Sequence, residues 1–266
     1  MTRWTDDPIT RLRTMPSVNE LAGKSVFITG GARRLGRAIA LAMAQAGARV
    51  AFTYLNSGEQ AKQTLAEIER RGAKGLAISC DARQEDSVIR AIGTALETFG
   101  AMDLLVNNAG IYTTARFEEI TVEQWDNIFA TNVRGPFLVS KHSLPALRRA
   151  RGRIINLGSL GGEKPWSTHA HYCSSKAALH MLTRVMAKAL APEIAVNCVA
   201  PGMIDIADDP GPDERNEGFF NRMASKTPMR RNGVADDVVN AVMYFAAASQ
   251  FITGQILTVD GGLGLE

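Results

Sequence analysis

The sequence has no long apolar run, little excess charge and few cysteines. No stretch approaches the roughly 18 apolar residues that a membrane-spanning helix needs. Residues 1–20 carry charges without the apolar centre of a signal peptide. The formal net charge is only +3, and no basic run alternates with aromatic residues. We therefore expect a cytoplasmic chain with neither a membrane nor a nucleic acid as partner.

The three cysteines, Cys80, Cys173 and Cys198, are an odd number without metal-ligand spacing, which predicts reduced thiols and no metal site. Cys173 directly follows Tyr172. Because adjacent residues of a helix do not share a face, and no base is marked for a thiol, we expect Cys173 to be a packing residue.

At 266 residues and 45% apolar composition, the chain suffices for one large domain. Short apolar runs alternate with segments of helical periodicity. This predicts fold class α/β: a single Rossmann-type doubly wound parallel sheet flanked by helices over residues 21–266, after an N-terminal arm of residues 1–20. The predicted strands are 25–29, 49–54, 75–80, 103–107, 152–158, 194–199 and 255–259, and the predicted helices 35–46, 59–71, 85–99, 121–147, 168–190 and 235–247.

A glycine-rich turn links the first predicted strand to the first predicted helix. It begins at Gly30 and ends at Gly36. Backbone N–H groups and the positive end of a helix suit a phosphate at such a turn, although a glycine turn also simply joins a strand to a helix.

The end of the second predicted strand lacks the carboxylate that binds ribose hydroxyls in an NAD site. After Tyr54, no Asp or Glu occurs until Glu59. Arg33 and Arg34 instead offer cationic forks for a 2′-phosphate, which favours NADP(H). The alternative is a pair of solvated loop arginines.

Polar residues follow later strands, at the edge where such sheets bind ligands. Asp81 is placed either to bond the adenine amino group or to cap a helix. Asn132 lies just before a Gly-Pro break in the helical pattern of 121–147. It either faces a water near Lys176 or makes a structural bond.

Three residues near one strand end suit proton transfer. Ser159 follows the strand 152–158, and Tyr172 and Lys176 lie one helical turn apart. Bringing a phenol from a pKa near 10 to about 7 needs roughly 4 kcal/mol, which one positive charge about 4 Å away supplies at an effective dielectric near 20. We therefore expect Lys176 to lower the pKa of Tyr172 to about 7, and Ser159 to hold the oxygen that exchanges the proton.

Residues 203–230 begin with a polar stretch rich in Asp, Pro and Gly and continue with an apolar patch at 218–223. This composition predicts either a substrate lid or a plain surface loop. No interdomain linker or internal repeat accompanies it.

Taken in order, the motifs are Thr29-Gly30…Gly36, Asp81, Asn107-Asn108-Ala109-Gly110, Asn132, Ser159, Tyr172-Cys-Ser-Ser-Lys176, Pro201-Gly202 and Val259-Asp260-Gly261-Gly262. With them the chain resembles the short-chain dehydrogenase/reductase family from about residue 21 to the end. The resemblance implies a nicotinamide cofactor, a homotetramer and a catalytic tetrad of Asn132, Ser159, Tyr172 and Lys176. The cofactor-binding residues that we expect are Gly30, Arg33, Arg34, Leu35, Gly36, Tyr54, Asn56, Ser57, Asp81, Ala82, Asn108, Ala109, Gly110, Tyr172, Lys176, Pro201, Gly202 and Ile204.

Arg34 stands where the family's glycine loop usually carries its second glycine, which is similar to the pteridine reductase branch. Well-known pteridine reductases have an Asp where this chain has Ser159, and the remainder is similar to 3-oxoacyl-(acyl carrier protein) reductases. We therefore expect an NADP(H)-dependent oxidoreductase that transfers hydride to a carbonyl or C=N carbon of a small molecule, with Tyr172 as general acid. The alternative from another class is a non-catalytic NADP(H)-sensing protein.

Overall fold

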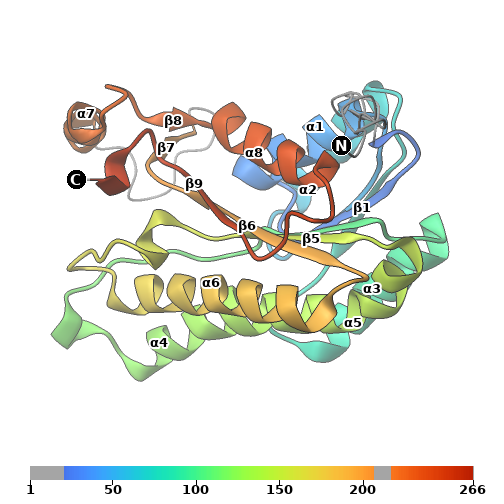
Figure 1. Ribbon diagram of the computed structural model, residues 1–266, viewed down its shortest axis with the longest axis horizontal. Coiled ribbons are helices and arrows are strands. Elements are labelled where there is room, and N and C mark those ends of the chain that lie inside the picture. Colours follow the sequence, from blue (N-terminus) through green and yellow to red (C-terminus); the bar gives the residue numbers. More distant parts are fainter. Residues whose placement is uncertain (1–20, 207–216, 266) are drawn as a thin grey trace, which may run out of the picture.

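A seven-stranded sheet lies between two layers of helices in the computed structural model, which describes residues 21–206 and 217–265 (Figure 1). All its strands are parallel, in the order β3-β2-β1-β4-β5-β6-β9. This confirms the predicted Rossmann-type doubly wound sheet. The predicted N-terminal arm lies outside the described residues. The strands are β1 (Ser25–Ile28), β2 (Arg49–Tyr54), β3 (Gly75–Ser79), β4 (Leu104–Asn107), β5 (Arg153–Leu157), β6 (Ala195–Pro201) and β9 (Ile256–Val259).

Both faces of the sheet are covered, which explains why its central strands are mainly apolar. Helices α1, α2 and α8 cover one face, and α3, α5 and α6 cover the other (Figure 1). Along β1, Val26 and Ile28 belong to the first core and Phe27 to the second, as the period of two of a strand requires. The helices are α1 (Arg34–Gln45), α2 (Gly58–Arg70), α3 (Glu85–Phe99), α4 (Val122–Phe129), α5 (Gly135–Ala150), α6 (Ala170–Leu190), α7 (Glu217–Lys226) and α8 (Ala235–Ala247). Within the two described ranges, no helix has the length and apolar character needed to span a membrane.

The predicted break in the helix 121–147 is a π-helical turn. Helix α4 begins after Thr121, whose side chain caps it, and continues into a π-helix at Ala130–Arg134. Helix α5 follows at once, with Pro136 in its first turn, where a proline needs no N–H partner. The π-helix carries Asn132, whose side chain is buried.

The predicted lid and the residues after it, up to 234, contain structure that the sequence did not predict. Strands β7 (Ile204–Asp205) and β8 (Gly233–Val234) form a separate parallel pair, and α7 lies between them along the chain. The N–H of Met229 donates to the carbonyl of Gly261 (3.1 Å), which joins this region to the turn after β9. Residues 207–216 of the predicted lid lie outside the described residues.

The glycine turn after β1 is locked to the end of β4. The side-chain amide of Asn108 donates to the carbonyls of Thr29 and Gly30, both at 2.9 Å. Gly30 has φ +67°, in the left-handed region that favours glycine. A Cβ on Gly36 would lie 2.0 Å from the carbonyl oxygen of Gly30, so only glycine lets α1 approach this closely.

We expect Gly36→Ala to destabilise the protein by about 2 kcal/mol or more, because the clash is with backbone and separates Gly30 from Asn108. Gly93→Ala is the matched control, since Gly93 lies within α3 with nothing within 4 Å of an added Cβ. That change should be neutral or stabilise by up to about 1 kcal/mol. Free energies of unfolding from urea titrations make the comparison. Equal, small effects of both changes would contradict the close approach at the turn.

Candidate active site

The sheet brings the predicted site residues together at the carboxyl ends of its central strands. Strand β4 lies between β1 and β5. Gly30 follows β1, Gly110 follows β4 and Ser159 follows β5, so these segments of distant sequence share one edge. Helix α6 presents Tyr172 and Lys176 in its first turns.

The ammonium of Lys176 is buried and anchored to backbone. Its Nζ donates to the carbonyl oxygen of Leu157, the last residue of β5, at 2.8 Å. Burial lowers the pKa of Lys176 to about 8, because the charged form loses solvation. The lysine therefore carries its charge at neutral pH and begins to lose it in mildly alkaline solution.

The phenol of Tyr172 is partly buried and hydrogen-bonds with Ser159. Burial raises the pKa of Tyr172 to about 12, and the bond with Ser159 offsets only part of that rise. The expectation that Lys176 lowers this pKa to about 7 is therefore wrong for this structure. Nζ of Lys176 lies 5.8 Å from the centre of the phenol ring and donates to Leu157 instead, so loss of solvation decides the direction.

The Ser159 segment is fixed by an imidazole that the sequence analysis did not single out. The N–H of Ser159 donates a long bond (3.4 Å) to Nε2 of His180, and the Ser159 hydroxyl accepts from the N–H of Gly161 (3.0 Å). A Cβ on Gly158 or on Gly162 would lie 2.3 Å and 2.6 Å from ring atoms of His180. Burial lowers the pKa of His180 to about 4, so the ring is neutral and its Nε2 accepts at neutral pH.

Asn132 makes structural bonds and also lies close to Lys176. Its amide donates to the carbonyl of Ile111 (3.0 Å) and to the hydroxyl of Ser175 (3.1 Å), and its oxygen accepts from the N–H of Ile111 (2.9 Å). A Cβ on Gly110 would lie 3.2 Å from Oδ1 of Asn132 and 3.7 Å from Nζ of Lys176. The two polar groups thus converge on one point, which the bare backbone of Gly110 leaves uncovered.

The glycine turn presents two arginines beside the end of β2. Arg33 is exposed and Arg34 partly exposed. Arg34 has φ +52°, in the left-handed region that favours glycine. Ser57 precedes α2 without making a side-chain cap bond. Cations, a hydroxyl and the N-terminal ends of two helices fit a phosphorylated dinucleotide.

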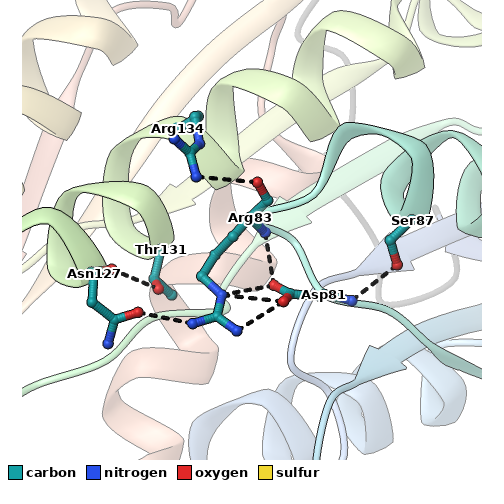
Figure 2. A network of polar contacts seen from close by, with 6 residues as sticks. All are labelled: Asp81, Arg83, Ser87, Asn127, Thr131 and Arg134. Atoms are coloured by element: carbon teal, nitrogen blue, oxygen red, sulfur yellow. Dashed lines mark hydrogen bonds and ion pairs between the residues drawn. The ribbon is translucent and has the colours of Figure 1, made fainter. Parts of the chain in front are cut away.

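The remaining predicted cofactor residues lie along the same edge of the sheet. Asp81 does not cap α3, whose N-cap is Gln84; its carboxylate pairs with Arg83 instead (Figure 2). Ala82 lies between the two members of this pair. The rest occupy strand ends and turns: Leu35 in the first turn of α1, Tyr54 at the end of β2 with Asn56 exposed after it, Asn108 and Ala109 after β4, Pro201 and Gly202 at the end of β6, and Ile204 in β7.

An aromatic side chain that the sequence did not predict for the site packs against the phenol. The rings of Tyr112 and Tyr172 meet edge to face, with centres 5.0 Å apart. The hydroxyl of Tyr112 and Nε2 of His169 share a 2.5 Å hydrogen bond, and Nδ1 of His169 contacts the hydroxyl of Thr168 (2.9 Å). The available signal was short spacing: Tyr112 comes two residues after Gly110, and His169 three residues before Tyr172.

The three cysteines are free thiols, and Cys80 and Cys198 are buried. In the part of the chain that the structure describes, no group of three or more His, Cys, Asp or Glu side chains is arranged to hold a metal ion.

Comparison with known proteins agrees with this geometry. A family model described as enoyl-(acyl carrier protein) reductase matches residues 30–264. The 3-oxoacyl-(acyl-carrier-protein) reductase FabG of Staphylococcus aureus is 36% identical over 243 residues, 90% of this chain and 98% of that protein.

Two solved structures share the fold over nearly their whole length. A short-chain dehydrogenase/reductase from Serratia marcescens has a TM-score of 0.86 at 36% identity, covering 92% of this chain and 99% of that one. A blue fluorescent protein from a metagenomic library, solved in complex with NADPH, has a TM-score of 0.84 at 33% identity, covering 91% and 98%. The chain therefore belongs to the short-chain dehydrogenase/reductase family of oxidoreductases.

Proposed function

We propose that this protein is an NADP(H)-dependent reductase that adds hydride to a carbonyl or C=N carbon while Tyr172 donates the proton. The observation that carries the proposal is the cluster at the end of β5, where Tyr172 bonds with Ser159 and the buried Lys176 ammonium lies one helical turn away. When bound, the nicotinamide supplies the hydride. The chain's own residues supply orientation and the proton.

The raised pKa of Tyr172 suits the reductive direction. A phenol whose pKa is about 12 is protonated at neutral pH, and an alkoxide is far more basic than a phenolate, so proton transfer to it is downhill. Nζ of the charged Lys176 lies 5.8 Å from the centre of the phenol ring. Ser159 steadies the substrate oxygen, and Asn132 next to Lys176 is placed to support a water relay.

The turn and the neighbouring strand ends would hold the cofactor. Gly30 and Gly36 let backbone N–H groups approach a pyrophosphate, and Arg33 and Arg34 would pair with a 2′-phosphate. The NADPH bound to one structural relative supports the choice of NADP(H). Lys176 would also bond the nicotinamide ribose.

Two substrate classes have specific support. The similarity to a 3-oxoacyl-(acyl-carrier-protein) reductase favours a 3-oxoacyl thioester. Arg34, at the loop position that resembles pteridine reductases, favours a pteridine. Homotetramer formation, a cytoplasmic location and a lid at residues 203–230 stay predictions.

Tyr172→Phe is expected to lower turnover by at least about 100-fold, because it removes a general acid without removing the ring. Wild type and variant are assayed by NADPH oxidation with ketones, 3-oxoacyl thioesters and dihydropteridines, and NADPH binding is followed by fluorescence. The control is Tyr244→Phe, a half-exposed tyrosine on α8.

Near-normal turnover of Tyr172→Phe with undiminished NADPH binding would remove the acid assignment. If the wild type binds NADPH but turns over no member of the panel, the alternative of an NADP(H)-sensing protein gains support.

Arg33→Ala is expected to weaken NADPH binding by about 10- to 100-fold, because charge-assisted hydrogen bonds to the 2′-phosphate are lost. NADH lacks that phosphate, so its binding should change by less than about threefold. Dissociation constants of both cofactors are measured for wild type, Arg33→Ala and Arg149→Ala, an exposed arginine on α5. Equal losses of affinity for NADPH and NADH would contradict the assignment of Arg33 to the 2′-phosphate.

A further inference from the structure

The carboxylate of Asp81 is already saturated by one arginine. Figure 2 shows the guanidinium of Arg83 lying across both oxygens. Nε donates to Oδ1 (2.9 Å) and Oδ2 (3.2 Å), a terminal nitrogen donates to Oδ2 (2.8 Å), and the N–H of Arg83 donates to Oδ1 (3.0 Å). A carboxylate offers about four acceptor positions. Arg83 therefore uses all the acceptor positions of the Asp81 carboxylate, and none is left for an incoming N–H donor.

The guanidinium is held from its other side as well. Its second terminal nitrogen donates to Oδ1 of Asn127 on α4 (2.8 Å), and the carbonyl of Asn127 accepts from Thr131 (2.9 Å) (Figure 2). The carbonyl of Arg83 accepts from Arg134 of the π-helix (3.3 Å). Contacts on both sides fix Arg83 over Asp81.

This pair lies at the edge of the sheet that we propose binds the dinucleotide. Asp81 follows β3, the neighbour of β2, and the N–H of Cys80 donates to the carbonyl of Tyr54 (2.8 Å), which keeps the two strand ends together. The Arg83 side chain is 35% exposed and that of Asp81 21%. A guanidinium has five N–H donors and no acceptor. The surface formed by Arg83 over Asp81 therefore offers hydrogen-bond donors, whereas the amino group of adenine needs an acceptor.

We propose that Arg83 sets the purine preference of the dinucleotide site, by replacing the acceptor edge of Asp81 with a donor edge. The site then binds a 6-oxo purine about as well as the 6-amino purine adenine. This rests on the proposed function, because it presumes a dinucleotide. It replaces the expectation that Asp81 itself selects the adenine amino group, and Arg83 acts as a specificity-determining residue.

The test compares binding of NADP⁺ and its hypoxanthine analogue, deamino-NADP⁺, by isothermal titration calorimetry. For wild type, we expect the two dissociation constants to agree within about threefold; for Arg83→Met, which frees Asp81, deamino-NADP⁺ should bind about tenfold more weakly than NADP⁺. Arg83→Lys keeps a cation on Asp81 and should show a smaller preference. Asn127→Ala loosens the contact with α4 but leaves the ion pair, so its ratio should match that of wild type.

Two results would overturn the proposal: a wild type that already prefers NADP⁺ about tenfold, or an Arg83→Met protein that binds NADP⁺ with an unchanged ratio. A shift of the ratio by Asn127→Ala equal to that of Arg83→Met would also overturn it, because a general loosening of the loop would then suffice. If wild type binds neither compound, the proposed function itself fails, and this inference with it.

Discussion

The site depends on one buried hydrogen bond, from the ammonium of Lys176 to the carbonyl of Leu157 (2.8 Å). A charge without a partner in this position would be strongly unfavourable, so the bond makes a buried lysine tolerable. It also fixes α6 against the end of β5, which places Tyr172 beside Ser159. The bare backbone of Gly110 leaves the space next to both Lys176 and Asn132 uncovered.

Loss of solvation moves the two titrating groups in opposite directions. Burial raises the pKa of Tyr172 to about 12 and lowers that of Lys176 to about 8, because each side chain loses solvation of its charged form. Their pKa values, nearly equal in water at 10.0 and 10.5, are thus moved apart, and at neutral pH the phenol is neutral and the ammonium is charged. This combination provides a proton donor with a cation one helical turn away.

Much of the fold could be predicted from the sequence. Both faces of the sheet are buried, so its strands are short apolar runs, and polar or glycine-rich segments separate them from the helices. Strand β2 and helices α3 and α8 begin and end where the apolar pattern predicts. The π-helix at 130–134 was predicted only as a break, since periodicity does not distinguish a π-turn from a kink. Strands β7 and β8 have two residues each, which is too few to show the alternation of apolar and polar residues that predicts a strand.

The site was predicted less completely, because its chemistry depends on contacts between distant residues. Motif spacing placed Ser159, Tyr172 and Lys176 at one strand end, but the direction of the Tyr172 pKa depends on burial, which spacing does not give. The guanidinium of Arg83, which engages Asp81, also donates to Asn127, 44 residues later in the chain, and spacing does not give that contact. The sequence does not distinguish His180 from the other residues of its helix. Its role becomes visible only in the structure, where Gly158 and Gly162 pack against its ring.

Titration of the Tyr172 hydroxyl tests most directly whether the phenol is a neutral donor. The protein is labelled with [¹³Cζ]tyrosine, and its NMR signal is assigned by comparison with Tyr172→Phe. The structure predicts that the Tyr172 signal stays at the position of a neutral phenol from neutral pH to above about pH 10. A shift to the phenolate position near about pH 7 would contradict it and would restore direct acidification by Lys176.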